Sequence, residues 1–439
     1  MLFVPPALAK AFNDTARIER MLEFEAALAR AEARTGVIPG AAAEAIAHAC
    51  RAEAYDLDAL HAAAMDSGNL AIPLVAALTR RVGDIDADAK GWVHWGATSQ
   101  DVIDTGLVLQ LREGLVFVEA ELDRLREALA TQADAHRRTV MPGRTWLQQA
   151  SPVTLGGKLA ACLAAFDRDR ARLDALKRNL FVVQLGGAAG NLAALGERGI
   201  DVTRALAAEL KLDVPPTPWH TQRDRLCECA SVLGIVTADA GKLARDLALL
   251  AQTEVGEAFE PSAPGRGGSS TMPQKRNPVG AAIALSAATR VPGLVATMLV
   301  AAVQEHERGL GNWPAEWDTL PRIVELCGSA LVAVAQVLSG LRVDAQRMRA
   351  NIELTQGQLF AEAAQMALAP KLGRDVAHGL VAEACRRAAS EGRHVRDVLA
   401  ETPPAREALD RAALTALFDP QQYLGSNDVY IDRVLRNRG

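Results

Sequence analysis

Residues 15–35 read TARIERMLEFEAALARAEART, and this pattern decides the fold class. Apolar residues recur at helical spacing with charged residues between them, which predicts an amphipathic helix. Similar patterns cover residues 105–135, 154–180, 226–259, 279–304 and 322–350. Several of these segments are longer than a usual globular helix, and long antiparallel helices with short connections indicate a bundle. Because no convincing run of alternating strand residues is present, we expect an all-α protein.

Length and composition are those of a globular protein with several domains. The chain has 439 residues, of which 49% are hydrophobic and 23% are charged. This length suggests about three domains. We expect an N-terminal helical domain over 1–104, a central long-helix bundle domain over 105–342 and a small C-terminal helical domain over 343–439. The formal net charge of −5 gives no electrostatic reason to expect a nucleic acid partner.

Secreted, metal-binding and membrane proteins each have sequence features that this chain lacks. The six cysteines include no CxxC pair that would indicate a zinc or redox site. The N-terminal MLFVPPALAKAFND is apolar only briefly and is broken by two prolines, unlike a secretory signal. The apolar stretch 281–303 contains Arg290 and Pro292, which makes it a poor membrane span. We therefore expect a soluble cytoplasmic protein with no metal, no nucleic acid and no membrane partner.

The segment PSAPGRGGSSTMPQKRNP at 261–278 is the most informative for chemistry. Its glycines and serines offer backbone N–H groups and hydroxyls, and residues 261–304 contain no Asp or Glu. The cations of this stretch are Arg266, Lys275, Arg276 and Arg290. Asn277 followed by Pro278 predicts a helix N-cap, so that the positive end of the next helix would point at this loop. These features indicate an anion site on a mobile loop; the alternative is an ordinary flexible linker.

Three further segments collect polar side chains ahead of long helices. HWGATSQD at 94–101 brings hydroxyls that could bind a substrate carboxylate or simply cap the following helix. GRTWLQQASPVT at 143–154 and QEHERGLGNWPAEWD at 304–318 are each weak alone, because a lone His or Arg on a helix is usually solvated or paired. The spacings required for a P-loop, a dinucleotide fingerprint, a GxSxG elbow and an HExxH zinc site are absent.

Taken together, these segments resemble the fumarase/aspartase superfamily, which includes argininosuccinate and adenylosuccinate lyases. GSSTMPQKRNP at 268–278 is similar to its signature, VHWGATSQDVIDTG at 93–106 to its first conserved region and GRTWLQQASP at 143–152 to its second. The resemblance implies an all-α fold of three helical domains. It also implies a homotetramer with a twenty-helix core, in which each active site is assembled from three subunits. The implied chemistry is addition–elimination beside a carboxylate, without a cofactor.

The same resemblance assigns candidate roles to residues. Ser269 matches the catalytic serine of the family, and Ser270 would support it. Lys275 and Asn277 would stabilise the negative charge that develops when a proton leaves or joins the carbon beside a carboxylate. The substrate-binding candidates are Asn69, Thr98, Ser99, Trp146, Gln148, His306 and Arg308.

Two departures narrow the branch of the superfamily. Adenylosuccinate lyases carry a His where this chain has Trp146, and another where it has Asn69. SGNLAIPLV, PWHTQRDR and VQEHERGLGNWPAEW resemble instead the cycloisomerase branch, which lactonises carboxymuconates in the protocatechuate branch of the β-ketoadipate pathway. Its substrate is a small tricarboxylate. In the reverse reaction, an elimination opens the lactone and a carboxylate is the leaving group, which needs no strong acid. The alternatives are another lyase of the superfamily, such as adenylosuccinate lyase, and a catalytically silent relative with a structural role.

Overall fold

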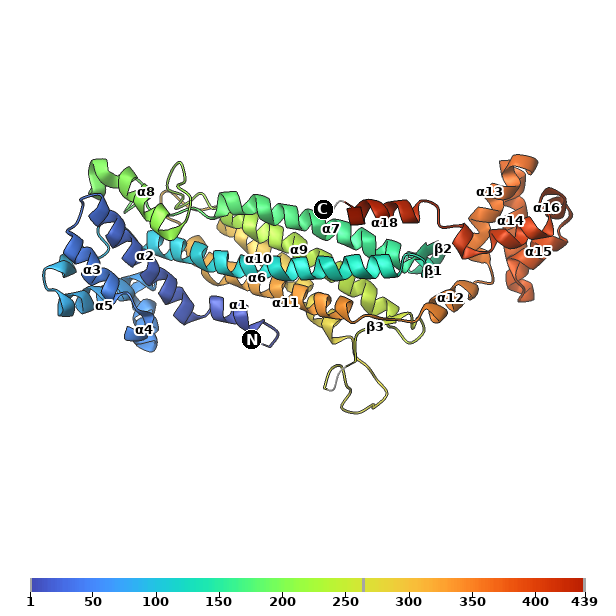
Figure 1. The fold of residues 1–439 in the computed structure, drawn as a ribbon, viewed down its shortest axis with the longest axis horizontal. Helices are drawn as coiled ribbons and strands as arrows, with labels where there is room; N and C mark the ends of the chain where they lie inside the picture. Colours follow the sequence, from blue (N-terminus) through green and yellow to red (C-terminus); the bar gives the residue numbers. More distant parts are fainter. Residues whose placement is uncertain (1, 263–264, 437–439) are drawn as a thin grey trace. The chain divides into compact units, whose positions relative to one another are not determined.

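The computed structural model describes residues 2–262 and 265–436, and these residues form mainly helices (Figure 1). The α-helices are α1 (Pro6–Ala11), α2 (Asp14–Arg34), α3 (Gly40–Ala49), α4 (Leu57–Ser67), α5 (Ala71–Ile85), α6 (Ser99–Ala135), α7 (Leu155–Leu180), α8 (Gly199–Leu210), α9 (Asp224–Leu250), α10 (Val279–Ala301), α11 (Asn312–Ser339), α12 (Ala345–Glu353), α13 (Ala361–Leu372), α14 (Arg374–Glu391), α15 (Val395–Glu401), α16 (Pro403–Ala408), α17 (Arg411–Leu417) and α18 (Asn427–Arg436). Short 3₁₀ turns are η1 (Ala52–Ala54), η2 (Ala89–Trp92), η3 (Ala193–Arg198), η4 (Gln358–Phe360) and η5 (Pro420–Gln422). The all-α prediction is confirmed.

Two small antiparallel hairpins accompany the helices. Strands β1 (Val140–Thr145) and β2 (Gln148–Thr154) form one hairpin, and β3 (Ala258–Phe259) and β4 (Arg342–Val343) pair in the other. The sequence pattern predicted no strands. The first hairpin was not predicted because Pro142 pairs with Pro152, and prolines are unusual within paired strands.

The chain folds as two compact units, each built from three stretches. The first unit comprises the residues up to Leu122, Asp169–Ala240 and Ile283–Val332. The second comprises Asp123–Arg168, Gly241–Ala282 and the residues from Ala333 onward. Each unit therefore combines residues from distant parts of the sequence. The division into three domains remains a prediction.

In the first unit, helix α2 organises the N-terminal helices. It contacts α3 and α8, and α5 contacts α3 and α4. The side chain of Asn13 accepts a hydrogen bond from Ala16 N at 2.8 Å and so caps α2, as such a residue commonly does. Helices α6 and α11 approach closely at Gly114, where a Cβ atom would lie 2.7 Å from Phe12 and 3.1 Å from Val324.

In the second unit, the C-terminal helices enclose a separate hydrophobic core. Helix α14 contacts α13 and α15, and the buried side chains of Leu368, Val381 and Val398 belong to this core. The rings of Phe360 and Phe418 pack against each other with their centroids 5.5 Å apart. Burial of these side chains supplies the main stabilisation of this region.

Helices α10 and α11 are each long and apolar enough, by length and composition, to cross a membrane. The apolar window of α11 is 78% buried inside the fold, as in the core helix of a soluble protein. That of α10 is only 22% buried, and the helix contains Pro292. Helix α10 therefore presents an apolar surface that the described part of the chain leaves uncovered.

Candidate active site

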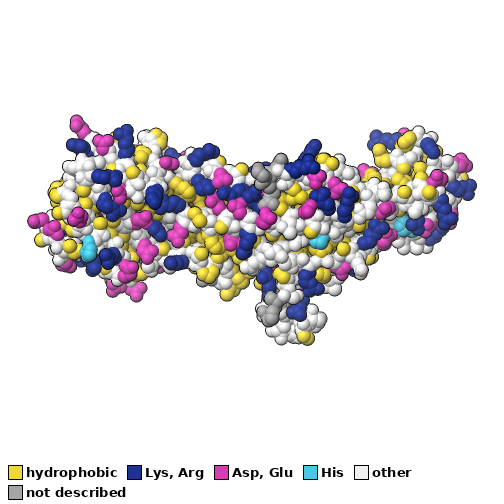
Figure 2. Space-filling model, in the orientation of Figure 1, with side chains coloured by type: hydrophobic (Ala, Val, Ile, Leu, Met, Phe, Trp, Pro, Cys, Tyr) yellow, Lys and Arg dark blue, Asp and Glu magenta, His cyan; other side chains and the backbone are white. Residues whose placement is uncertain are grey.

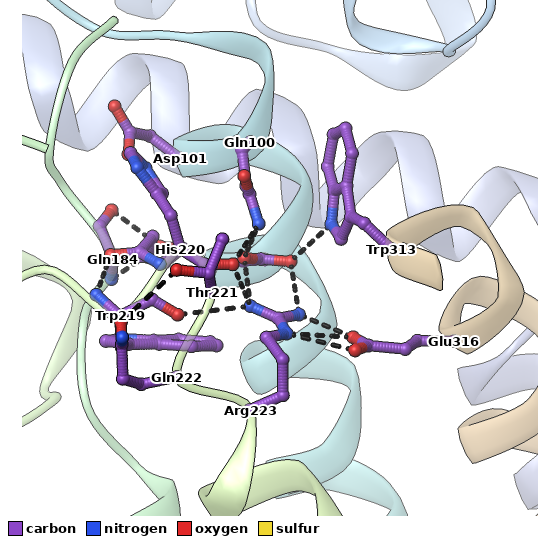
Figure 3. A network of polar contacts seen from close by, with 12 residues as sticks. Gln100, Asp101, Gln184, Trp219, His220, Thr221, Gln222, Arg223, Trp313 and Glu316 are labelled. Carbon is purple, nitrogen blue, oxygen red and sulfur yellow. Dashed lines mark hydrogen bonds and ion pairs between the residues drawn. The ribbon is translucent and has the colours of Figure 1, made fainter. Parts of the chain in front are cut away.

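The turn before α6 is fixed by the carboxylate of Asp101 (Figure 3). This carboxylate accepts the N–H of Thr98 at 3.0 Å, as in one half of a capping box. It also accepts the N–H groups of residues 186–187, each at 2.9 Å, and lies 2.7 Å from Nε2 of His220. Because a carboxylate oxygen accepts hydrogen bonds, we assign a proton of the His220 ring to Nε2.

Arg308, which lies 210 positions after Thr98 in the sequence, contacts this turn. Its Nη2 donates to Thr98 Oγ1 at 3.1 Å and to Ala188 O at 3.3 Å, and its Nε donates to Gln100 Oε1 at 3.1 Å. The structure thus brings together two predicted substrate-binding residues, Thr98 and Arg308, with Ser99 next to Thr98 in the chain. The Nη1 atom of Arg308 donates to no described residue, which leaves it available for a carboxylate.

Gln100 contacts a buried ionic network formed by Asp104, Arg223 and Glu316. The fully buried guanidinium of Arg223 donates to the two oxygens of Asp104 at 2.7 and 3.0 Å and to Glu316 at 2.6 Å. Trp313 Nε1 donates to Asp104 at 3.0 Å (Figure 3). Burial lowers the pKa of Arg223, but the two carboxylates outweigh it, and the pKa is raised.

Gln100 joins this network to Arg308. Its amide nitrogen donates to Asp104 at 3.1 Å and to the carbonyl of His220 at 2.8 Å, while its oxygen receives Arg308. The sequence motifs did not identify Gln100, Asp101, Asp104, His220 or Arg223 as site residues. The available signal was PWHTQRDR at 218–225, a polar cluster directly before an apolar helix.

Two other predicted residues of the first unit are placed differently. His306 is exposed with a left-handed backbone (φ 47°), and its carbonyl accepts Thr221 Oγ1 at 2.9 Å. The side chain of Asn69 accepts Ile72 N at 3.2 Å near the start of α5. Among the residues that the structure describes, no hydrogen bond joins either side chain to Thr98 or Arg308. Their roles in binding remain predictions.

His94, four residues before Thr98, is anchored to α2. Its Nδ1 lies 2.5 Å from the buried carboxylate of Glu25. Burial lowers the pKa of His94, but attraction and hydrogen bonding to Glu25 outweigh burial, so the pKa is raised. Glu32, also buried, has its pKa raised to about 9 by burial and by the charge of Glu25. The buried carboxylate of Glu25 therefore holds His94 in place.

In the second unit, Trp146 and Leu147 form the two-residue turn between β1 and β2. Both have left-handed backbones, with φ of 53° and 64°, although neither is the Gly or Asn that such a turn favours. Each such residue costs about 1–2 kcal/mol. The indole of Trp146 is 99% exposed, and Gln148 follows it on the exposed tip.

The base of the same hairpin is firmly held. Arg144 donates to the two oxygens of Glu257 at 2.9 and 2.6 Å, and Glu257 is fully buried. Asn351 donates to the same carboxylate at 2.7 Å. A strained turn persists only where its surroundings enforce it, and strain of this kind gathers at functional sites. The hairpin therefore presents Trp146 on a rigid support.

The predicted catalytic residues share one loop of the second unit, residues 265–278, called here the signature loop. Ser269 Oγ accepts the N–H groups of Thr271 at 3.3 Å and Met272 at 3.0 Å. Donors aimed at an oxygen favour its deprotonated form, which suits a serine that handles protons. Lys275 is exposed on the same loop.

Asn277 closes the neck of the signature loop. Its N–H donates to Gly267 O at 2.7 Å, and its amide nitrogen donates to Gly268 O at 3.3 Å. A Cβ atom on Gly267, whose φ is +67°, would lie 2.6 Å from Asn277 O. Only glycine fits there, because the backbone at Gly267 approaches the backbone at Asn277 so closely.

The predicted N-cap role of Asn277 is wrong. The N–H groups of Gly280 and Ala281, at the start of α10, donate to the carboxylate of Glu260 at 2.9 and 2.8 Å. A carboxylate is a stronger partner for a helix N-terminus than an amide oxygen. Because Glu260 occupies this position, the positive end of α10 does not serve the loop, whose charge comes from its own Lys and Arg side chains.

Comparison with known proteins identifies the family. A family model described as lyase matches residues 4–293, and one described as adenylosuccinate lyase C-terminus matches residues 357–434. The chain belongs to the fumarase/aspartase superfamily of lyases. The all-α fold class and the superfamily predicted from sequence are therefore confirmed.

Within this superfamily, several similar proteins at 45–55% identity are named for one reaction. The 3-carboxy-cis,cis-muconate cycloisomerase of Pseudomonas aeruginosa is 54% identical over 99% of this chain and 94% of its own. The structure of the 3-carboxy-cis,cis-muconate lactonizing enzyme of Pseudomonas putida has a TM-score of 0.94 and 52% identity, covering 99% of this chain and 97% of that one. The β-carboxy-cis,cis-muconate cycloisomerase of Acinetobacter calcoaceticus has a TM-score of 0.94 and 45% identity, covering 99% of both chains.

Proposed function

We propose that the chain is a cycloisomerase that converts 3-carboxy-cis,cis-muconate to 4-carboxymuconolactone, as a soluble cytoplasmic enzyme that needs no cofactor. The near-full-length similarity to enzymes of this name carries the proposal. Trp146 and Asn69 support it, because they stand where adenylosuccinate lyases keep two histidines. A lactone-forming reaction expels no nucleotide nitrogen, so it does not need those histidines as acids.

Substrate binding begins at the turn before α6. Arg308 binds one of the three substrate carboxylates through Nη1, while its other nitrogens are fixed by Thr98 and Gln100. Ser99 and Gln148 donate to the remaining carboxylates, and Trp146 limits the pocket where other members keep a His. Holding the substrate in a closed conformer gives a large rate gain, because the attacking oxygen belongs to the same molecule.

The reaction forms one C–O bond and one C–H bond. A substrate carboxylate oxygen attacks the ring-closing carbon, and the electron pair of the double bond moves toward the conjugated carboxylate. Lys275 and Asn277 stabilise the negative charge that develops there. Ser269 then delivers the proton to the adjacent carbon, helped by its two backbone donors, and His306 assists in the exchange of protons with water.

The complete site requires more than one chain. The candidate residues form three groups: Thr98 and Arg308 belong to the first unit, whereas the hairpin tip with Trp146 and the signature loop are separate segments of the second. The exposed indole of Trp146 and the uncovered apolar surface of α10 are features of interaction surfaces. A homotetramer covers these surfaces. Each of its active sites combines the three groups, one from each of three subunits.

An absorbance assay tests the reaction. We expect purified protein to consume the conjugated diene of 3-carboxy-cis,cis-muconate with the lactone as product, and to leave adenylosuccinate and argininosuccinate intact. The second candidate is a lyase acting on adenylosuccinate, which the C-terminal family match makes worth testing. Cleavage of adenylosuccinate without loss of the diene would establish that candidate and contradict our proposal.

The serine assignment has a matched control in its neighbour. Ser269→Ala is expected to abolish turnover while the circular dichroism spectrum and melting temperature stay unchanged. Ser270→Ala is expected to retain most of the activity, because its hydroxyl is only supporting. Retained activity in Ser269→Ala would disprove the assignment.

Mixed tetramers test the shared site. Chains carrying Ser269→Ala and chains carrying Arg308→Ala are each expected to be inactive alone. After joint refolding in equal amounts, about a quarter of the sites combine an intact loop with an intact Arg308, because the two come from different subunits. Recovery of activity is therefore expected. A mixture as inactive as its components would mean that one chain builds each site.

A further inference from the structure

A cavity of about 230 Å³ lies at the base of the signature loop in the second unit. Arg266 and Arg276 line it from the two ends of the loop, and Arg342 lines it from β4. Figure 2 shows Lys and Arg side chains, in dark blue, where the projecting loop begins. Of the described lining residues, only Glu260 is acidic, and its carboxylate already receives the N–H groups of α10. The lining therefore has an excess of positive charge.

The arginines of this cavity keep unused hydrogen-bonding capacity. Arg266 Nη2 lies 3.6 Å from Glu260 and Nη1 donates to Gln336 at 3.3 Å, but its buried Nε has no partner among the described residues. Arg342 donates to Ser262 Oγ at 3.3 Å. Arg276 forms no ion pair with any residue that the structure describes. Because buried donors without partners are costly, this arrangement favours an anion with several oxygens.

The remaining wall of the cavity is apolar. Its apolar lining residues include Ala251 and Phe259. An inorganic oxyanion gains nothing from such a wall, whereas the methylene groups of an organic acid bury apolar area against it. The lining therefore matches a short carbon chain with a carboxylate at each end.

We propose that this cavity binds a small dicarboxylate, which bridges Arg266, Arg276 and Arg342. The ligand would hold the two ends of the signature loop together, adjacent to the neck where Asn277 N donates to Gly267 O. Because Asn277 lines the cavity and also belongs to the predicted catalytic set, occupation of the cavity restrains the loop from its base. This inference concerns a second binding site and does not depend on the identity of the substrate.

Calorimetric titration of the full-length protein with succinate tests the proposal. A dicarboxylate can also enter the substrate site, so each titration is made in an Arg308→Gln background as well. We expect succinate to bind in that background, and Arg342→Gln or Arg276→Gln to weaken its affinity at least tenfold. The exposed Arg198→Gln is the matched control and should leave the affinity unchanged. Inorganic phosphate should bind at least several-fold more weakly than succinate.

Three results would overturn the proposal. The first is the absence of succinate binding in the Arg308→Gln background. The second is binding that is indifferent to both Arg342→Gln and Arg276→Gln. The third is phosphate binding as tight as that of succinate, which would contradict the dicarboxylate assignment. If Arg342→Gln does not fold, as judged by its thermal melt, the exposed Arg276 still provides the test.

Discussion

The network around Arg223 and the signature loop are both polar, but they are built in opposite ways. In the network, a fully buried guanidinium bonds to Asp104 and Glu316 within one unit (Figure 3). In the loop, Lys275 is exposed, and the side-chain hydrogen bonds of Ser269 and Asn277 stay within the loop. The difference fits our proposal, in which one chain completes its own positioning groups while the groups assigned to the reaction stay open to substrate and to other subunits.

The largest expected effect comes from breaking the network. Arg223→Met leaves Asp104 and Glu316 buried without their counter-charge, which costs about 3–5 kcal/mol of unfolding free energy. Urea denaturation measures this loss. Arg225→Met, two residues further along, is the matched control. Because Arg225 is only partly buried and donates to a carbonyl, its loss should cost less than about 1 kcal/mol. Equal losses in both variants would contradict the contrast between network and surface.

Breaking the loop should affect activity and not stability. Lys275→Met removes the cation expected at the developing charge, and kcat should fall about 10²–10³-fold. The melting temperature should stay within error of the unmodified protein, because Lys275 is exposed. Gln274→Ala, its neighbour on the loop, serves as the control and should keep kcat within a few-fold. A large drop in the melting temperature of Lys275→Met would show instead that Lys275 contributes to the stability of the fold.

Glu32 sharpens the comparison, because it is buried like Arg223 but forms no ion pair with any residue that the structure describes. Its pKa of about 9 in the folded protein lies far above the ordinary value of a carboxyl group. The folded state therefore holds a proton that the unfolded state releases, and stability falls as the pH rises from about 4.5 toward 9. Glu32→Gln should remove this dependence and gain roughly 3 kcal/mol over the parent between pH 6 and pH 8.

Unfolding at pH 6, 7 and 8 measures the effect of Glu32→Gln. The control is Glu19→Gln on the same helix, where the side chain is exposed; this variant keeps Glu32 and should follow the parent at every pH. If both variants followed the parent at every pH, the raised pKa of Glu32 would be refuted.

The sequence predicted the helices and the segments that carry the chemistry, because periodicity and motif are local properties. It did not predict that Arg308 donates to Thr98, since these residues are 210 positions apart. The role of Glu260 at α10 and the Arg223 network were missed for the same reason. The Trp146–Leu147 turn was missed because its backbone is imposed by the hairpin and not by residues that prefer that conformation.

The exposed turn at Trp146 also gives this protein an optical label of its own. An indole in water emits at longer wavelength than one enclosed by protein, and this indole is 99% exposed in the single chain. The other tryptophans are more enclosed, so a change at Trp146 would dominate a shift in emission. If the proposed tetramer encloses this indole, a dilution series followed by fluorescence reports the concentration at which subunits assemble, before any substrate is added.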